Sequence, residues 1–340
     1  MNTTSLKSQK IRYGIIGFGG FAERAIGPAL RNSPNAELVA IHKRSLDDAQ
    51  RKAREHNISL AFDRARDLVT HPDVDAVFIA SANADHCEQT LLAAAAGKHV
   101  IVEKPMAIRQ READRMIEAC ARARVRLMVA HMIRFSPLAQ RIRQRIAEGS
   151  IGRVIAARAD FSFDASTSPR TWIFDRKLAG GGPVFDIGVH CLDSLRFVLD
   201  DEVVTVSAEL SPLPTATRTE ETAQIALTFS KGAIGSIFCS FVSPFRRSFI
   251  RVTGTEGILS AEDFTLGSRT LELTIQHGRA GALEGLSTER VEVPNLYVQE
   301  ITHFSDRILS GGEHVSPGEN GCQNQRVLDA VMESRGLSLR

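Results

Sequence analysis

The chain has 340 residues, of which 43% are hydrophobic and 24% charged, and its net charge at pH 7 is +2. This length exceeds one ordinary core and predicts two domains, and the composition is that of a soluble globular protein. A near-neutral charge, with no basic cluster interleaved with aromatic residues, argues against a nucleic-acid partner.

The N-terminal stretch MNTTSLKSQK is polar and lacks the apolar core of a signal peptide. The apolar run LLAAAAG, which begins at Leu91, is too short to cross a bilayer. The five cysteines are scattered and form no C-x-x-C pair, which favours reduced thiols over disulfides or zinc ligands. We therefore expect a cytoplasmic protein with no membrane partner and no bound metal.

Strand-like and helix-like segments alternate along the first 130 residues. Such alternation predicts a doubly wound parallel sheet, and we assign residues 1–130 to a domain of the α/β class. The expected strands are 11–16, 36–42, 75–80, 98–103 and 126–131, and the expected helices are 21–32, 46–57, 86–97 and 110–124.

After about residue 150 the apolar residues recur with period two, which indicates strands. We assign residues 131–340 to an α+β domain with a largely antiparallel sheet. The expected strands are 223–229, 233–241, 249–257, 271–276 and 290–294, and the first two form a hairpin. Three helices are expected: one that begins after Gly182, one over 296–311 and one over 323–336.

The sequence GFGGFA, which follows the first expected strand, fits the pattern G-x-G-x-x-A. Gly17 permits a tight turn, Gly19 lets backbone N–H groups approach a pyrophosphate, and Ala22 lets the helix pack closely on the sheet. The helix start would face the phosphates with its partial positive charge. A plain strand–turn–helix is the alternative. The predicted cofactor residues here are Gly17, Phe18, Gly19, Gly20, Phe21 and Ala22.

The second expected strand ends without the carboxylate that usually binds the ribose hydroxyls of NAD. Lys43, Arg44 and Ser45 stand there instead. Two cations and a hydroxyl suit a 2′-phosphate, so we predict NADP as the cofactor, with NAD as the alternative. A solvated basic turn is also open, and Asp47 or Asp48 would approach the ribose if the strand ran longer.

Lys104 directly follows an expected strand, in AGKHVIVEKP. Ligands of open α/β sheets bind beyond the carboxyl ends of the strands, so this lysine is placed where a nicotinamide would bind. A lysine in such a position is otherwise a surface charge.

Three motifs together, namely the glycine turn, GKHVIVEKP and GGGPVFDIGVHCLD, resemble the glucose-fructose oxidoreductase / inositol dehydrogenase / MocA (Gfo/Idh/MocA) family over nearly the whole chain. Trp172 before AGGG, and SLRFVLDDE after it, resemble the branch of sugar dehydrogenases and 1,5-anhydrofructose reductases. The resemblance implies that residues 1–130 form a dinucleotide-binding Rossmann domain. It also implies that residues 131–340 bind substrate and form oligomers through an open sheet, with Lys104, Asp186 and His190 as the catalytic residues. One departure is Ala82, where many members have proline.

Asp186 and His190 are four residues apart and so share one face of the expected helix. Histidine can take or return the proton of a reacting hydroxyl, a neighbouring carboxylate can orient it, and Lys104 can stabilise charge on the oxygen. We expect the three glycines from Gly180 to let the chain pass close to the ligands. A structural histidine is the first alternative; a metal pair is the second, but a third ligand with suitable spacing is lacking.

Several further assignments accompany these. His86 lines the cofactor site by resemblance or caps its helix, Arg134 contacts substrate or is a surface arginine, and Trp172 stacks on a sugar or fills a gap. On the cofactor side we also place Ser81, Asn83, Glu103 and Lys104; the substrate side comprises Lys104, Arg134, Trp172, Asp186 and His190.

The resulting hypothesis is an NAD(P)-dependent oxidoreductase, preferring NADP, that acts on a sugar, polyol or cyclitol. A regulatory protein on the same fold is one alternative, although it would be expected to lose Lys104 or His190. A reductase of a non-sugar carbonyl is another. Because 233–241 carries Ile234 and Phe238 on one face and Ile237 on the other, we expect a homodimer or homotetramer built through the C-terminal sheet.

Overall fold

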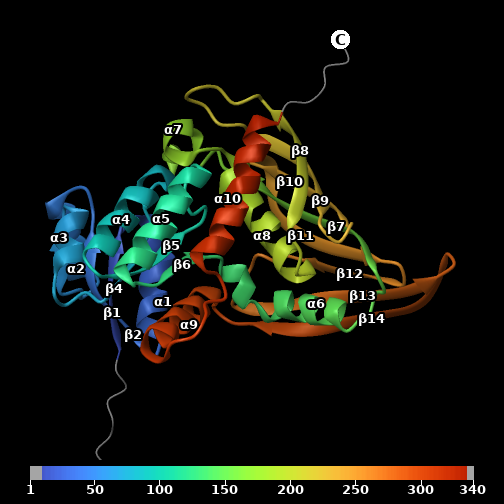
Figure 1. The fold of residues 1–340 in the computed structure, drawn as a ribbon, viewed down its shortest axis with the longest axis horizontal. Helices are drawn as coiled ribbons and strands as arrows, with labels where there is room; N and C mark the ends of the chain where they lie inside the picture. The colour runs from blue at the N-terminus through green and yellow to red at the C-terminus, as the bar shows by residue number, and fades with distance from the viewer. Residues whose placement is uncertain (1–9, 335–340) are drawn as a thin grey trace, which may run out of the picture. The chain divides into compact units, whose positions relative to one another are not determined.

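The described part of the chain comprises residues 10–334 of a computed structural model, drawn in Figure 1. Its contacts divide it into two units. The first holds residues up to 106 together with 112–130 and 297–319, and the second holds 107–111, 131–296 and the residues from 320 on.

The sheet of the first unit has six strands in the order β3-β2-β1-β4-β5-β6, and every neighbouring pair is parallel. This is the order of a Rossmann fold, with its switch point between β1 and β4. The predicted doubly wound sheet is therefore confirmed. Its strands are β1 (Ile11–Ile16), β2 (Ala36–His42), β3 (Leu60–Phe62), β4 (Ala76–Ile79), β5 (His99–Glu103) and β6 (Leu127–Ala130).

The helices of this unit follow the strands as expected, except that α3 and the short strand β3 were not predicted. The first helix begins as a π-helical segment, η1. The segments are η1 (Ala22–Ile26), α1 (Gly27–Asn32), α2 (Leu46–Glu55), α3 (Ala65–Thr70), the 3₁₀ turn η2 (Asn83–Asp85), α4 (His86–Ala95), α5 (Gln110–Ala123) and α9 (Leu296–Ser310).

Helix α9 corrects the expected domain division, which assigned all residues after 130 to the second domain. The Tyr13 hydroxyl lies 2.8 Å from Ser305 Oγ in a fully buried contact. Asn35 Nδ2 donates to Asp306 Oδ1 at 2.6 Å and to the carbonyl of Thr302. These bonds join α9 to the N-terminal strands, and periodicity along the chain does not report such distant partners.

The sheet of the second unit has eight strands in the order β14-β13-β12-β11-β7-β10-β9-β8. Only β7 and β10 pair in parallel, so the sheet is largely antiparallel, and β9 and β10 form the predicted hairpin. The strands are β7 (Val154–Asp164), β8 (Val203–Ser211), β9 (Thr222–Phe229), β10 (Ile234–Ser240), β11 (Val242–Gly254), β12 (Gly257–Glu262), β13 (Arg269–Arg279) and β14 (Ala282–Val293).

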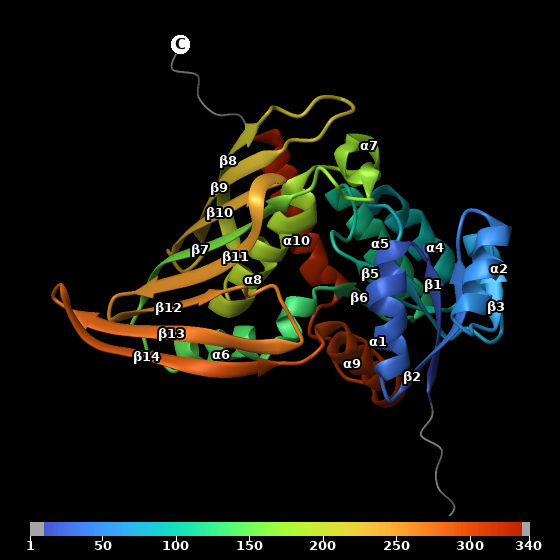
Figure 2. The same cartoon turned by 180° about the vertical axis from the view of Figure 1, so that it is seen from behind.

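Helices cover one face of this sheet. Figures 1 and 2 show α6, α8 and α10 gathered on one side of the strands. In β10 the side chain of Ile237, facing this layer, is 1% exposed, whereas that of Ile234 is 64% exposed. The segments are η3 (Met132–Phe135), α6 (Pro137–Ala147), η4 (Thr171–Phe174), α7 (Arg176–Ala179), the π-helical η5 (Val184–Gly188), α8 (Val189–Leu199) and α10 (Gly318–Glu333).

All five cysteines are buried free thiols, as their scattered positions predicted. Within residues 10–334, no helix combines the length and apolar character that a membrane span requires.

Candidate active site

The glycine turn after β1 is shaped by a close backbone contact. Gly17 has φ +84°, and a Cβ on it would lie 2.8 Å from the Cα and N of Ser81, in the segment after β4. A side chain is therefore excluded by conformation and by space. A Cβ on Gly19 would have its nearest neighbouring atom 4.0 Å away, so this part of the turn is open to a ligand. Ala22, 1% exposed, packs against the core as predicted.

The basic segment Lys43–Ser45 directly follows β2. The strand ends at His42, and Lys43 Nζ donates to the carbonyl of Phe18 at 3.2 Å, which joins this segment to the glycine turn. Ser45 is the N-cap of α2, since its Oγ accepts the N–H of Asp48 at 3.3 Å. Arg44 is exposed. The three residues predicted to bind the 2′-phosphate thus have different surroundings: Lys43 is bound to the glycine turn, Ser45 caps a helix, and Arg44 is exposed.

The segment after β4 is built around a buried histidine. His86 is 0% exposed, and its Nδ1 lies 3.0 Å from the carbonyl oxygen of Pro105. Burial lowers the pKa of His86 to about 4, so the ring is neutral near pH 7 and donates from Nδ1. His86 thereby holds the segment after Lys104 and presents no exposed surface to a ligand. Nearby, Ser81 Oγ donates to Gln89 at 2.6 Å and Asn83 is 5% exposed.

Lys104 follows β5 and is half-buried, beside Glu103, which is 8% exposed. The backbone N–H of Lys104 contacts Glu103 Oε2 at 3.2 Å. Glu300, on α9, is 0% exposed, and burial together with the charge of Glu103 raises its pKa well above the ordinary value. Sequence reasoning missed Glu300; a glutamate on the apolar side of a helix was the only available signal.

The three glycines before η5 make room for the protein itself, which corrects the expectation that they admit ligands. A Cβ on Gly180 or Gly181 would lie 2.6 or 2.5 Å from the ring of Phe185. On Gly182 it would lie 2.2 Å from the carbonyl oxygen of Glu220. The turn is therefore pressed between a buried aromatic ring and another backbone segment.

Asp186 lies in the π-helical segment η5 and His190 in the following α8. Four residues are close to one turn of either helix type, and π-helical turns are frequent at functional sites. Asp186 is 9% exposed and accepts two hydrogen bonds from Arg170, at 3.1 and 2.9 Å. His190 is half-buried, with its ring 6.2 Å from that of Phe161. Arg170 was not predicted, because it lies in an irregular loop.

Asp193, one turn further along α8, belongs to a different cluster. It is 2% exposed and accepts two bonds from Arg134, both at 2.9 Å, and one from Asn324 at 2.8 Å. Burial opposes its ionisation, but the charges of Arg134 and His131 hold the pKa of Asp193 well below its usual range. Arg134 is 8% exposed and holds Asp193, a geometry that favours a structural role over the predicted substrate contact.

Trp172 lies in η4, half-buried, and packs against the hydrophobic core of the second unit. This placement favours the gap-filling alternative, while stacking on a sugar stays a prediction. Cys191 is 0% exposed, as expected for a small core side chain.

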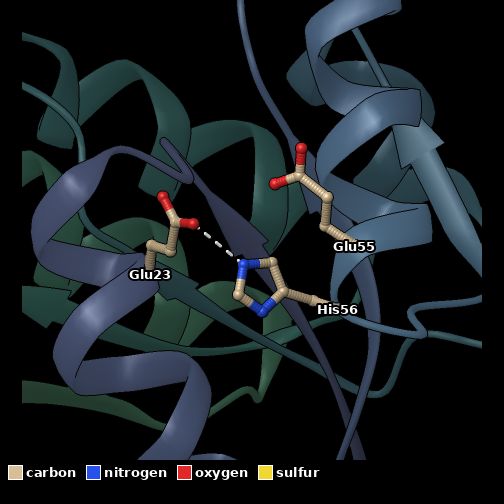
Figure 3. A group of neighbouring side chains, drawn as sticks. All are labelled: Glu23, Glu55 and His56. Carbon is tan, nitrogen blue, oxygen red and sulfur yellow. Dashed lines mark hydrogen bonds and ion pairs between the residues drawn. The ribbon is translucent and has the colours of Figure 1, made fainter.

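Among residues 10–334, one group has the spacing of metal ligands: Glu23, Glu55 and His56 (Figure 3). Lys52 Nζ lies 2.7 Å from Glu23 and 2.8 Å from Glu55, and His56 Nε2 lies 2.9 Å from Glu23. Hydrogen bonds from Lys52 and His56 lower the pKa of Glu23 to about 2. Arg51 also pairs with Glu55, at 2.7 Å, so two cations balance the two carboxylates, and the group functions as an ion-pair cluster that joins η1 to α2.

Two family models match the chain. The model "Oxidoreductase family, NAD-binding Rossmann fold" covers residues 11–131, and the "GFO/IDH/MocA C-terminal domain" covers residues 139–260. Among curated proteins, the 1,5-anhydro-D-fructose reductase of Ensifer adhaerens is 33% identical over 91% of this chain and 92% of its own. The D-xylose 1-dehydrogenase (NADP(+)) 2 of Haloferax volcanii is 28% identical over 95% and 96%.

Among solved structures, levoglucosan dehydrogenase in complex with NADH and L-sorbose superposes with a TM-score of 0.84. It is 27% identical, and the match covers 96% of each chain. These matches extend over both units, and with them the chain is identified as a member of the GFO/IDH/MocA family, oxidoreductases with an NAD-binding Rossmann fold.

Proposed function

We propose that this oxidoreductase transfers a hydride between NADP and a hydroxyl-bearing or carbonyl carbon of a sugar, polyol or cyclitol. The observation that carries the proposal is the buried helix start that presents Asp186 and His190, in a chain that also has a nucleotide-type glycine turn and Lys104 after β5. The names of the reductase and dehydrogenase relatives support a sugar substrate.

The glycine turn fits a dinucleotide. Gly19 leaves open space where a side chain would stand, and the following residues begin the helical run of η1 and α1. Backbone N–H groups at such a turn bind pyrophosphate. When bound, the nicotinamide supplies or accepts the hydride.

The chain's own residues handle the proton and the developing charge. His190 gives a proton to the carbonyl oxygen during reduction and takes it back during oxidation. Lys104 donates a hydrogen bond to the same oxygen and stabilises negative charge on it. Asp186, which accepts hydrogen bonds from Nη1 and Nη2 of Arg170, binds a neighbouring substrate hydroxyl or orients the histidine.

Substitution of the two proton-handling residues tests these roles. Lys104→Ala and His190→Ala should each lower turnover by about 10²–10⁴-fold, while the affinity for NADPH, followed by its fluorescence, stays within a few fold. Exposed Lys177→Ala and His277→Ala are matched controls. The probes are 1,5-anhydro-D-fructose with NADPH, and D-xylose or levoglucosan with NADP or NAD. Wild-type turnover in either variant would remove the assigned role.

The preference for NADP is a separate step of the proposal. The basic segment at the end of β2 supports it, since Arg44 is exposed there and Asp48 is engaged by Arg51 at 2.9 Å. Charged hydrogen bonds are worth about 1.5–3 kcal/mol each, so NADP should bind roughly tenfold to a few hundredfold more tightly than NAD. Arg44→Asp should move the kcat/KM ratio toward NAD, whereas Arg54→Asp, at an exposed site on the helix that follows, should not. A wild-type ratio that favours NAD would contradict the assignment.

We also propose a homodimer or homotetramer assembled through the face of the eight-stranded sheet that the helices leave open. Ile234 is 64% exposed on that face, and Phe238 of the same strand is half-buried. Covering such a face removes apolar area from water. Light scattering should therefore report an oligomer at micromolar concentration, and Ile234→Glu should shift it toward the monomer. A monomeric wild type would contradict the proposal.

A further inference from the structure

The helical run that carries Asp186 and His190 has no capping side chain of its own. Its first turn follows Pro183, which makes no side-chain bond to the helix start. The first N–H groups of a helix need acceptors from elsewhere, above all when they are buried. Here the acceptor comes from a residue 36–38 positions later: Glu220 Oε1 accepts the N–H of Gly182 at 2.9 Å and that of Val184 at 3.1 Å.

Gly182 links Glu220 to Asp186 through backbone hydrogen bonds. Its N–H is held by Glu220, and its carbonyl accepts the N–H of Asp186 at 3.0 Å and that of Phe185 at 3.1 Å. The backbones of Gly182 and Glu220 also touch, because a Cβ on Gly182 would lie 2.2 Å from the carbonyl oxygen of Glu220. The position of Glu220 therefore sets where the helix, and with it Asp186, begins.

Glu220 is itself fixed to the sheet. It is 0% exposed and lies two residues before β9. The next residue, Glu221, donates its N–H to the carbonyl of Ser211 at 3.0 Å and accepts the N–H of Phe241 at 2.8 Å. The carboxylate is thus placed by backbone bonds to the segments that end β8 and follow β10, and it does not depend on a flexible loop.

The charge of Glu220 also matches its position. A carboxylate at a helix N-terminus interacts favourably with the helix dipole. Burial raises the pKa of Glu220, so the surroundings oppose ionisation, while the two N–H groups favour it. A carboxylate in so apolar a place is costly unless its contacts are needed.

We propose that Glu220 is a positioning residue of the active site: it anchors the glycine turn and sets the register of the helix that presents Asp186 and His190. The inference rests on the proposed function for its catalytic consequence. The anchoring itself does not depend on which substrate the enzyme takes.

Three variants and one control test the inference. Glu220→Ala removes the acceptor, Glu220→Asp keeps the charge but shortens the reach, and Glu220→Gln keeps an oxygen at the position of Oε1. Glu221→Ala, at the partly exposed neighbouring side chain, is the control. Hydrogen–deuterium exchange of the peptide spanning residues 181–190 reports the anchor, and kcat with 1,5-anhydro-D-fructose and NADPH reports the positioning.

The expected result is exchange about 10–100-fold faster in Glu220→Ala, the fold-change that corresponds to losing a hydrogen bond to a charged group. Its kcat should fall at least about tenfold, with NADPH affinity unchanged. Glu220→Gln keeps the acceptor oxygen but not the charge, so it should exchange only about 2–5-fold faster than wild type and keep most of its kcat. Glu220→Asp should lie between the Gln and Ala variants, and the control should match wild type. Should the alanine variant fail to fold, the Asp and Gln variants carry the comparison.

Unchanged exchange in the alanine or aspartate variant would overturn the anchor. Faster exchange with unchanged kcat would overturn the positioning role. A wild-type protein that converts none of the probes would refute the proposed function instead, and the exchange result would then still decide whether Glu220 anchors the helix.

Discussion

Acidification should destabilise the protein through His86, the buried histidine that holds the segment after Lys104. Its ring is 0% exposed and donates to the carbonyl of Pro105, and burial lowers its pKa from 6.5 to about 4. In the unfolded chain the histidine regains its ordinary pKa and binds a proton first as the pH falls. The stability that comes from keeping the ring neutral is therefore complete above about pH 6.5 and is lost as the pH falls toward 4.

The size of the effect follows from the shift of the pKa. Each pKa unit corresponds to about 1.36 kcal/mol, so the drop from 6.5 to about 4 corresponds to about 3 kcal/mol in the free energy of unfolding. A loss of that size is a large fraction of the net stability of a domain. Because the side chain of His86 is fully buried, solvent screening does not reduce this free energy.

The assay compares the wild type with His86→Asn, whose amide can donate to Pro105 but does not titrate. Urea unfolding followed by circular dichroism from about pH 7 to about pH 4 gives the free energy of unfolding of each. The wild type should lose about 3 kcal/mol more than the variant over this range, because other groups cancel in the difference. His277→Asn, at an exposed site, controls for loss of a histidine. A difference that stays constant with pH would refute the reasoning.

Three other substitutions have defined outcomes. Gly17→Ala places a Cβ 2.8 Å from the Ser81 backbone, at a residue with φ +84°. It should destabilise the first unit by at least about 1–2 kcal/mol and weaken NADPH binding. An NADPH affinity equal to that of the wild type would contradict the close contact between Gly17 and Ser81. Arg134→Ala leaves Asp193 buried without its bidentate partner; denaturation should show a loss of about 3–5 kcal/mol, and a loss below about 1 kcal/mol would mean that the network is not structural. Arg170→Lys keeps the charge but loses the paired hydrogen bonds to Asp186. It should lower kcat/KM by about tenfold with little change in stability, and Arg54→Lys, at an exposed site, is the control. An unchanged kcat/KM would show that the paired geometry is not needed.

Local patterns in the sequence were sufficient for much of the fold. Strands β1 and β2 begin and end at the predicted residues 11–16 and 36–42. The glycine turn, Lys104 after β5, and the helix with Asp186 and His190 were found because each depends on neighbours a few positions away. Short-range periodicity does not resolve an element as small as the three-residue β3.

The tertiary structure decided which distant residues meet. It pairs Arg170 with Asp186, places Glu220 at the start of the helix, buries Glu300 near Glu103, and assigns α9 to the first unit. It also shows that the three glycines accommodate Phe185 and the Glu220 backbone. Apart from the contact of the glycines with Phe185, these contacts join residues that lie at least 16 positions apart in the chain. A buried polar group must find its partner wherever the fold brings one, and local sequence periodicity carries no record of that partner.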